Sequence, residues 1–142
     1  MKLTHAIKGY LLFKSARASA TTIDTDGVLL RQFTRWFDVD PDVAEIDAET
    51  IRRYLDYQKT ERKLADASRR RIHAVLSGLY TWLGRPDIGL VLNNPVKTVP
   101  APTIPQTVIT PLSQEQIERL LKAADRARMS RRARALLLFL LD

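Results

Sequence analysis

The sequence contains no cysteine and only two histidines among its 142 residues. The absence of cysteine excludes disulfide bonds, thiol catalysis and cysteine-ligated zinc. The histidines and carboxylates also show no spacing that is typical of metal ligands. We therefore expect neither a metal site nor another cofactor, while the apolar fraction of 45% indicates an ordinary globular core.

Long apolar runs are missing as well. The N-terminal stretch MKLTHAIKGY has no apolar segment that could serve as a signal peptide. The apolar run from Leu136 to Leu141 is far shorter than the ~20 residues that a membrane-spanning helix needs. These absences predict a soluble, cytoplasmic protein with no membrane partner.

Basic residues outnumber acidic ones and are unevenly distributed along the chain. Lys and Arg total 23 against 16 Asp and Glu, which gives a net charge of +7. Residues 1–20 carry four basic and no acidic side chains, and residues 21–60 carry five basic and nine acidic ones. Residues 61–86 carry six basic and two acidic side chains. Such alternation is typical of a fold with one positive surface that binds a polyanion, although solvated helix faces give the same pattern.

Apolar residues recur with helical spacing over most of the chain. Four amphipathic helices are predicted, over residues 3–16, after the N-cap Ser19, after the N-cap Asp47, and along the stripe from Ile72 to Leu83. The fourth helix should end near Gly84, and residues 88–92 allow one further short helical turn. No stretch alternates with period two for long enough to predict a substantial strand, so the expected fold class is all-α with four to five helices.

The composition changes after residue 93. The segment NPVKTVPAPTIPQTVITP contains five of the seven prolines, and it predicts an extended linker because proline fixes φ and removes a backbone donor. Ser113 and Gln116 then form a capping box, and a further helix is expected near Ser130. Two helices are too few to close a core. We expect a first domain over 1–96, a linker over 97–111, and the truncated beginning of a second domain over 112–142.

Six short motifs follow one another along the chain. They are Ser19 and Thr22 with Leu30 and Phe33, DAETIRRYL at 47–55, LADASRRRIHAVL at 64–76, the pair Asn94-Pro95, LSQEQIERLL at 112–121, and RRARALLLFLLD at 131–142. In this order they resemble the tyrosine recombinases, the phage-integrase and Xer-like family, over nearly the whole chain. The resemblance implies a SAM-like core-binding domain followed by the first helices of a catalytic domain. Asp26 departs from the pattern, because a tyrosine is common at that position.

The resemblance also indicates which catalytic residues to look for. Such recombinases use an arginine, a lysine, a His-x-x-Arg pair, a further histidine or tryptophan, and a tyrosine that attacks the DNA phosphate. Neither His5 nor His73 has an arginine three residues later. Tyr10, Tyr54 and Tyr80 lie in apolar stripes, where core packing is the usual role. We therefore assign no catalytic residue and expect no catalysis from this chain alone.

The candidate DNA contacts lie on the second and fourth helices. A helical wheel centred on Ile72 turns Arg70 and Ala74 away from the core and puts Arg71 and His73 on opposite flanks. Serine and arginine side chains at the start of the fourth helix suit phosphate contact, because the helix dipole is positive there. The resemblance implies that both helices face the major groove. The expected contacts are Thr22, Thr25, Arg31, Arg35, Ser68, Arg69, Arg70 and Arg71.

These assignments have plainer alternatives. The arginines of the fourth helix also fit a solvated face, and Thr22 and Thr25 also fit N-terminal helix capping. Lys8, Lys14 and Arg17, in and directly after the first helix, are weaker candidates for contact with the DNA backbone.

These patterns predict the DNA-binding N-terminal portion of a site-specific tyrosine recombinase. It would clamp one duplex half-site while an absent C-terminal domain catalyses strand exchange. Its partners would be double-stranded DNA and, in the full-length protein, other recombinase protomers. Two alternatives stay open: a helical protein-interaction module without a nucleic-acid role, and a helix-turn-helix regulator that binds an operator as a dimer.

Overall fold

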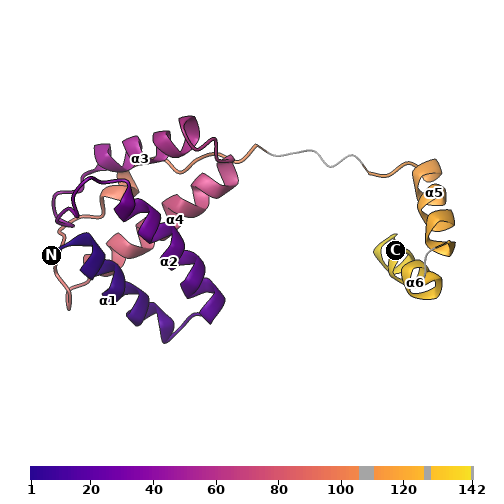
Figure 1. Ribbon diagram of the computed structural model, residues 1–142, viewed down its shortest axis with the longest axis horizontal. Coiled ribbons are helices and arrows are strands. Elements are labelled where there is room, and N and C mark those ends of the chain that lie inside the picture. The colour runs from indigo at the N-terminus through magenta and orange to yellow at the C-terminus, as the bar shows by residue number, and fades with distance from the viewer. Residues whose placement is uncertain (106–110, 127–128, 142) are drawn as a thin grey trace. The chain divides into compact units, whose positions relative to one another are not determined.

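The structure, a computed structural model, describes residues 1–105, 111–126 and 129–141, and it divides into two compact units, Met1–Pro105 and Gln106–Asp142. The first unit contains α1 (Leu3–Ser15), α2 (Ala20–Arg35), α3 (Ala48–Thr60), α4 (Asp66–Leu83) and the 3-10 helix η1 (Pro95–Thr98), as Figure 1 shows. The second unit contains α5 (Gln114–Asp125) and α6 (Ser130–Leu141). The described ranges hold no strand, only one isolated bridge between Lys2 and Asp42, and the all-α prediction is confirmed.

The helices begin where the sequence supplies capping side chains. The Ser19 hydroxyl accepts a hydrogen bond from the Thr22 amide at 3.3 Å, and the Asp47 carboxylate accepts one from the Thr50 amide at 2.8 Å. Both predicted N-caps are confirmed, and a cap of this kind stabilises a helix by about 1 kcal/mol. α4 ends at Leu83 with Gly84 as its C-cap, which agrees with the predicted end near Gly84.

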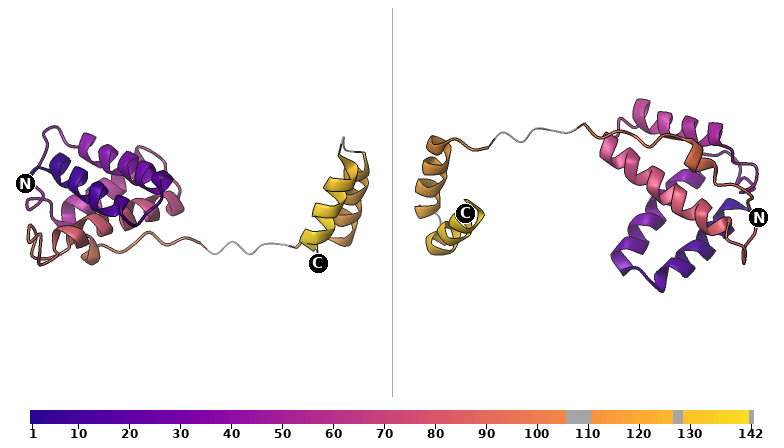
Figure 2. Two further views of the ribbon diagram at one scale, coloured as in Figure 1. Left: turned by 90° about the horizontal axis from the view of Figure 1, so that it is seen from below. Right: turned by 180° about the vertical axis from the view of Figure 1, so that it is seen from behind.

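The apolar stripes of all four α-helices meet in one core. α1 and α2 lie antiparallel and side by side, and α4 crosses behind α2 in the view of Figure 1; Figure 2 shows the same arrangement from below and from behind. The fully or almost fully buried side chains include Leu3, Leu30, Phe33, Ile51, Ile72, Leu79 and Leu83. Full burial of one such side chain contributes about 1.5–3 kcal/mol. This core is therefore the main source of stability of the first unit.

Aromatic rings fill the space between α2 and α3. The ring centroid of Tyr54 lies 4.7 Å from that of Phe33 and 5.4 Å from that of Trp36. Tyr54 and Tyr80 are fully buried, and Tyr10 is nearly so. The prediction that these three tyrosines pack in the core is confirmed.

The first unit continues beyond residue 96, the domain end that the sequence predicts. Asn94 caps η1, because its side-chain oxygen accepts a hydrogen bond from the Val96 amide at 2.9 Å. The side-chain NH2 group of Asn94 also donates to the Ser77 carbonyl on α4 at 3.0 Å. The Nε2 atom of His73 on α4 donates to the Val99 carbonyl at 2.8 Å, and Val99 is buried. The chain therefore packs against the first unit as far as Val99, because α4 supplies partners for its backbone.

The second unit is a pair of helices. The predicted capping box is present: Ser113 accepts from the Gln116 amide at 3.3 Å, and the Gln116 side chain accepts from the Ser113 amide at 2.9 Å. Arg134 on α6 forms an ion pair with Asp125 at the end of α5 at 2.8 Å. Several large apolar side chains of α6 are exposed, namely Leu136, Leu138, Phe139 and Leu140. The assignment of 112–142 to a second domain stays a prediction.

Candidate nucleic-acid interface

One buried carboxylate joins three helices of the first unit. Asp26 on α2 has an exposed fraction of 0%, and it accepts hydrogen bonds from Lys14 Nζ on α1 and from Arg71 Nη2 on α4, the latter at 2.6 Å. A buried carboxylate without such partners would be strongly destabilising. The two cations therefore make the burial of Asp26 tolerable, and they fix α1 and α4 against α2.

Lys14 stays protonated in this triad of Lys14, Asp26 and Arg71. Partial burial alone would lower the pKa of Lys14, but the hydrogen bond to Asp26 and the nearby Tyr10 outweigh it and raise the pKa above its ordinary value. The ordinary value of about 10.4 is already far above neutrality. The triad thus holds two positive charges and one negative charge, and the Arg71 side chain remains 50% exposed.

The residues expected to contact phosphate at the start of α4 differ in exposure. Ser68 and Arg70 are exposed, and within the described ranges Arg70 forms no ion pair. Arg69 is only 13% exposed and forms an ion pair with Asp66, three residues earlier on α4. Arg70 and the exposed half of Arg71 are therefore the cations that this end of α4 offers to a ligand, whereas Arg69 is largely occupied within the protein.

The outward face of α4 follows the predicted helical wheel. Arg70 and Ala74 are exposed, Arg71 points to Asp26 on α2, and His73 points to the Val99 carbonyl on the opposite flank. The wheel prediction is confirmed for these four positions. The alanine side chain leaves room beside Arg70 for close approach of another surface. His73 is occupied by a structural hydrogen bond.

The two threonines expected on α2 both form hydrogen bonds within their own helix. Thr22 lies one turn before Asp26, and its hydroxyl is 2.9 Å from the Ser19 hydroxyl in the N-terminal cap. The exposed Thr25 hydroxyl donates to the Thr21 carbonyl at 2.8 Å. A hydroxyl that donates within its helix cannot donate to a phosphate at the same time. Thr25 would therefore have to break this hydrogen bond, by turning its hydroxyl hydrogen about the Cβ–Oγ1 bond, to serve as a phosphate donor.

Arg31 and Arg35 lie on a different flank of α2. Both are exposed, and with Lys8 they border a groove of about 290 Å³ between α1 and α2. Arg31 folds over Gly27, where an added Cβ atom would lie 3.0 Å from Nη1 of Arg31. This flank of α2 faces α1, whereas Asp26 also reaches α4. The expected contacts thus form two groups, one around Arg70 and Arg71 and one around Arg31 and Arg35.

A further basic group gathers where α1 packs against α4. The guanidinium carbons of Arg17 and Arg85 lie 5.2 Å and 4.8 Å from the centroid of the Phe13 ring. Together with Lys14 they border a cavity of about 380 Å³. Arg85 was not predicted as a contact, because the residues around it in the sequence indicate only the end of a helix. Tertiary packing places it near Arg17, since both guanidinium groups lie over the ring of Phe13.

These observations define a small all-α domain that presents unpaired and partly paired cations at its surface. Residues 8–89 match the family model described as phage integrase, N-terminal SAM-like domain. The chain belongs to this family, the N-terminal domains of tyrosine recombinases, and the resemblance read from the motifs is confirmed.

Two solved structures share the fold. The integrase from mycobacterium phage Brujita aligns with a TM-score of 0.60 and 23% identity, covering 81% of this chain and 38% of its own. The XerA recombinase aligns with a TM-score of 0.53 and 23% identity, covering 93% of this chain and 44% of its own. At this identity the likeness shows the fold alone, and the chain spans less than half the length of either structure. No curated protein matches the sequence.

The described residues contain neither a membrane-spanning helix nor a cluster of metal-ligating side chains. None of the helices described by the structure combines the length and apolarity that a membrane crossing needs. The same residues contain no group of three or more histidine, aspartate or glutamate side chains that could hold a metal ion.

Proposed function

We propose that this chain is the DNA-binding N-terminal portion of a site-specific tyrosine recombinase. In this proposal it clamps one duplex half-site, and a C-terminal catalytic domain of the recombinase carries out strand exchange. Family membership supports the class of protein. The observation that carries the proposal is the start of α4, where Arg70 is exposed and Arg71 is half exposed over a fixed anchor.

The proposed grip on DNA uses three properties of this end of α4. Arg70 extends freely and can contact a phosphate or the edge of a guanine. Arg71 is held by Asp26 on one side, so its remaining N–H groups are already oriented when DNA arrives. Ser68 adds a hydroxyl donor within the first turn, where the helix dipole also favours an anion.

The remaining expected contacts have supporting roles in this proposal. Thr22 and Thr25 lie at the N-terminal end of α2, and Arg31 and Arg35 form the second basic group on the flank of α2 that faces α1. We assign Arg69 a mainly structural role, because Asp66 and the surrounding protein cover it. α5 and α6 would be the first helices of the catalytic domain, the site of action would be cytoplasmic, and the partners would be duplex DNA and other recombinase protomers.

The test is the salt dependence of duplex binding by the full chain. Fluorescence anisotropy with a labelled duplex should give an affinity that falls steeply between about 50 and 200 mM salt, because DNA binding releases counterions. Arg70→Ala should lower the slope of log K against log salt by about 0.9, the value for one lost phosphate contact.

The matched control for this test is Arg53→Ala. Arg53 is exposed on α3, and the described residues include no ion-pair partner for it. The control removes the same charge from another helix and should leave the slope nearly unchanged. Absence of salt-sensitive duplex binding, or equal effects of the two variants, would contradict the proposal and favour the protein-interaction module.

A further inference from the structure

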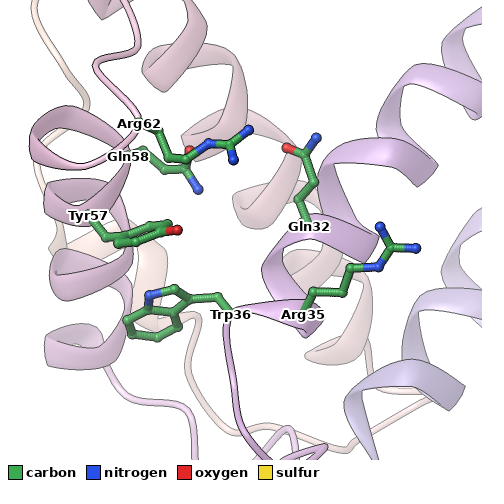
Figure 3. A pocket seen from close by; sticks show the side chains of 6 residues that line it. All are labelled: Gln32, Arg35, Trp36, Tyr57, Gln58 and Arg62. Atoms are coloured by element: carbon green, nitrogen blue, oxygen red, sulfur yellow. The ribbon is translucent and has the colours of Figure 1, made fainter.

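α2 and α3 enclose a polar cleft that shares only Arg35 with the residues proposed to contact duplex DNA. Its volume is about 250 Å³, and Figure 3 shows its six lining side chains around one opening. They are Gln32 and Arg35 from α2 with Trp36 directly after it, and Tyr57 and Gln58 from the C-terminal part of α3 with Arg62 shortly after it. Two aromatic rings, two carboxamides and Arg62 thus lie around this opening, and Arg35 stands at its edge with its guanidinium group turned away from the rings (Figure 3).

The aromatic rings form one wall of the cleft and are held in place by the core. The centroids of Trp36 and Tyr57 lie 6.4 Å apart with an angle of 46° between the ring planes. Trp36 also packs against the buried Tyr54 ring at 5.4 Å. Both lining rings are only partly buried, so part of each remains accessible to a planar ligand.

Two polar side chains beside this wall are buried and face each other. Gln58 is only 4% exposed, and the Tyr54 hydroxyl on the preceding turn is buried. Burial raises the pKa of Tyr54 to about 12, and the interaction with the Gln58 side chain offsets only part of this rise, so the hydroxyl keeps its proton. A carboxamide has two N–H donors and an oxygen with two lone pairs, so its contact with Tyr54 leaves Gln58 with further capacity to hydrogen-bond a ligand.

The rim of the cleft is cationic. Arg35 and Arg62 are both exposed, and neither forms an ion pair with a residue that the structure describes. Arg62 lies in the short connection from α3 to α4, six residues before Ser68. The cleft is therefore close along the chain to the residues proposed to hold the duplex.

We propose that this cleft binds an unpaired nucleotide of a nucleic-acid strand. Aromatic faces accept stacked bases, carboxamides hydrogen-bond to the edges of unpaired bases, and guanidinium groups bind phosphate. The volume lies just below the range of about 300–1,000 Å³ for small-molecule pockets, so it suits a base with part of its sugar and leaves the phosphate at the arginine rim. An acidic peptide would satisfy the arginines, but it would leave the stacking wall and the buried amide without a function.

The experiment uses the full chain with Trp82→Phe, which leaves Trp36 as the only tryptophan. A single-stranded oligothymidylate is titrated, and the quenching of Trp36 fluorescence gives the affinity. Gln58→Leu, which keeps the side-chain size, and Arg62→Ala should each weaken binding by about tenfold, whereas Arg53→Ala should change it by less than about twofold. Circular dichroism checks that every variant is folded, and Gln32→Ala replaces Gln58→Leu if the latter does not fold.

A parallel titration with duplex DNA separates this inference from the proposed function. Gln58→Leu should leave duplex affinity within about twofold, and Arg70→Ala should weaken duplex binding while leaving Trp36 quenching in place. The inference is overturned if oligothymidylate does not quench Trp36, if the cleft variants bind it as the parent does, or if an oligoglutamate peptide quenches Trp36 equally well. Loss of duplex binding alone would count against the duplex grip and not against the cleft.

Discussion

Replacement of Asp26 by asparagine tests the triad that joins α1, α2 and α4. Asp26→Asn keeps the shape of the side chain and removes its charge, so Lys14 and Arg71 lose their shared counter-ion. Loss of one partner from a fully buried ion pair costs about 3–5 kcal/mol. Here the Lys14 and Arg71 side chains are 29% and 50% exposed and can turn to water. We therefore expect a smaller loss, of about 1–3 kcal/mol in the free energy of unfolding.

Thermal and urea unfolding, followed by circular dichroism, measure this loss. Each kcal/mol should lower Tm by roughly 4–8 °C for a unit of this size. Asp24→Asn is the matched control, because Asp24 is exposed on the same helix and no ion pair links it to another described residue. If Asp26→Asn is as stable as Asp24→Asn, the triad does not stabilise the helix packing and the reasoning is wrong.

Three further changes probe other contacts of the first unit. Because the pKa of Lys14 is raised on folding, its stabilising contribution is complete below the unfolded pKa of about 10.4 and is lost as pH rises through the folded pKa. In urea unfolding, Lys14→Met should therefore lose less free energy of unfolding at alkaline pH than the parent does. An equal loss in both proteins would refute this role of Lys14. Gly78→Ala should lower the free energy of unfolding by about 1–3 kcal/mol, because the added Cβ would lie 2.6 Å from the hydroxyl of buried Tyr10. Tyr10→Phe, which removes that hydroxyl, should restore part of the stability in a double-mutant cycle of urea unfolding. Absence of coupling between the two substitutions would refute the contact. His73→Ala removes the hydrogen bond to the Val99 carbonyl, so it should lower the free energy of unfolding by about 1 kcal/mol. It should also speed proteolytic cleavage near Val99. An unchanged cleavage rate would show that His73 does not hold this segment.

Local features explain why so much of the fold could be predicted. Ser19 and Asp47 act on amide groups three residues away, so their capping roles are encoded within one helical turn. The buried stripe of α4 has the same local character, and it placed Arg70 and Arg71 on the correct faces.

The features that the sequence did not predict depend on contacts between distant segments. Val99 lies in a proline-rich stretch that reads as a linker, and only the His73 side chain and the core show that it is packed. The partners of Asp26 lie 12 and 45 residues away, so the sequence could show it only as a polar residue on an apolar stripe. The ion pair between Arg69 and Asp66 could have been predicted locally, because the two residues are three apart on one helix. Counting basic residues alone does not reveal such a pair.

The shared carboxylate has a consequence for how this lineage can change. Asp26 is the shared counter-ion of Lys14 and Arg71, so a neutral residue at position 26 would leave two neighbouring positive charges without a compensating carboxylate. Relatives that carry tyrosine at the position of Asp26 should therefore have exchanged one or both of those bases. The three sites would be inherited as a unit, and an alignment should reveal them as covarying columns.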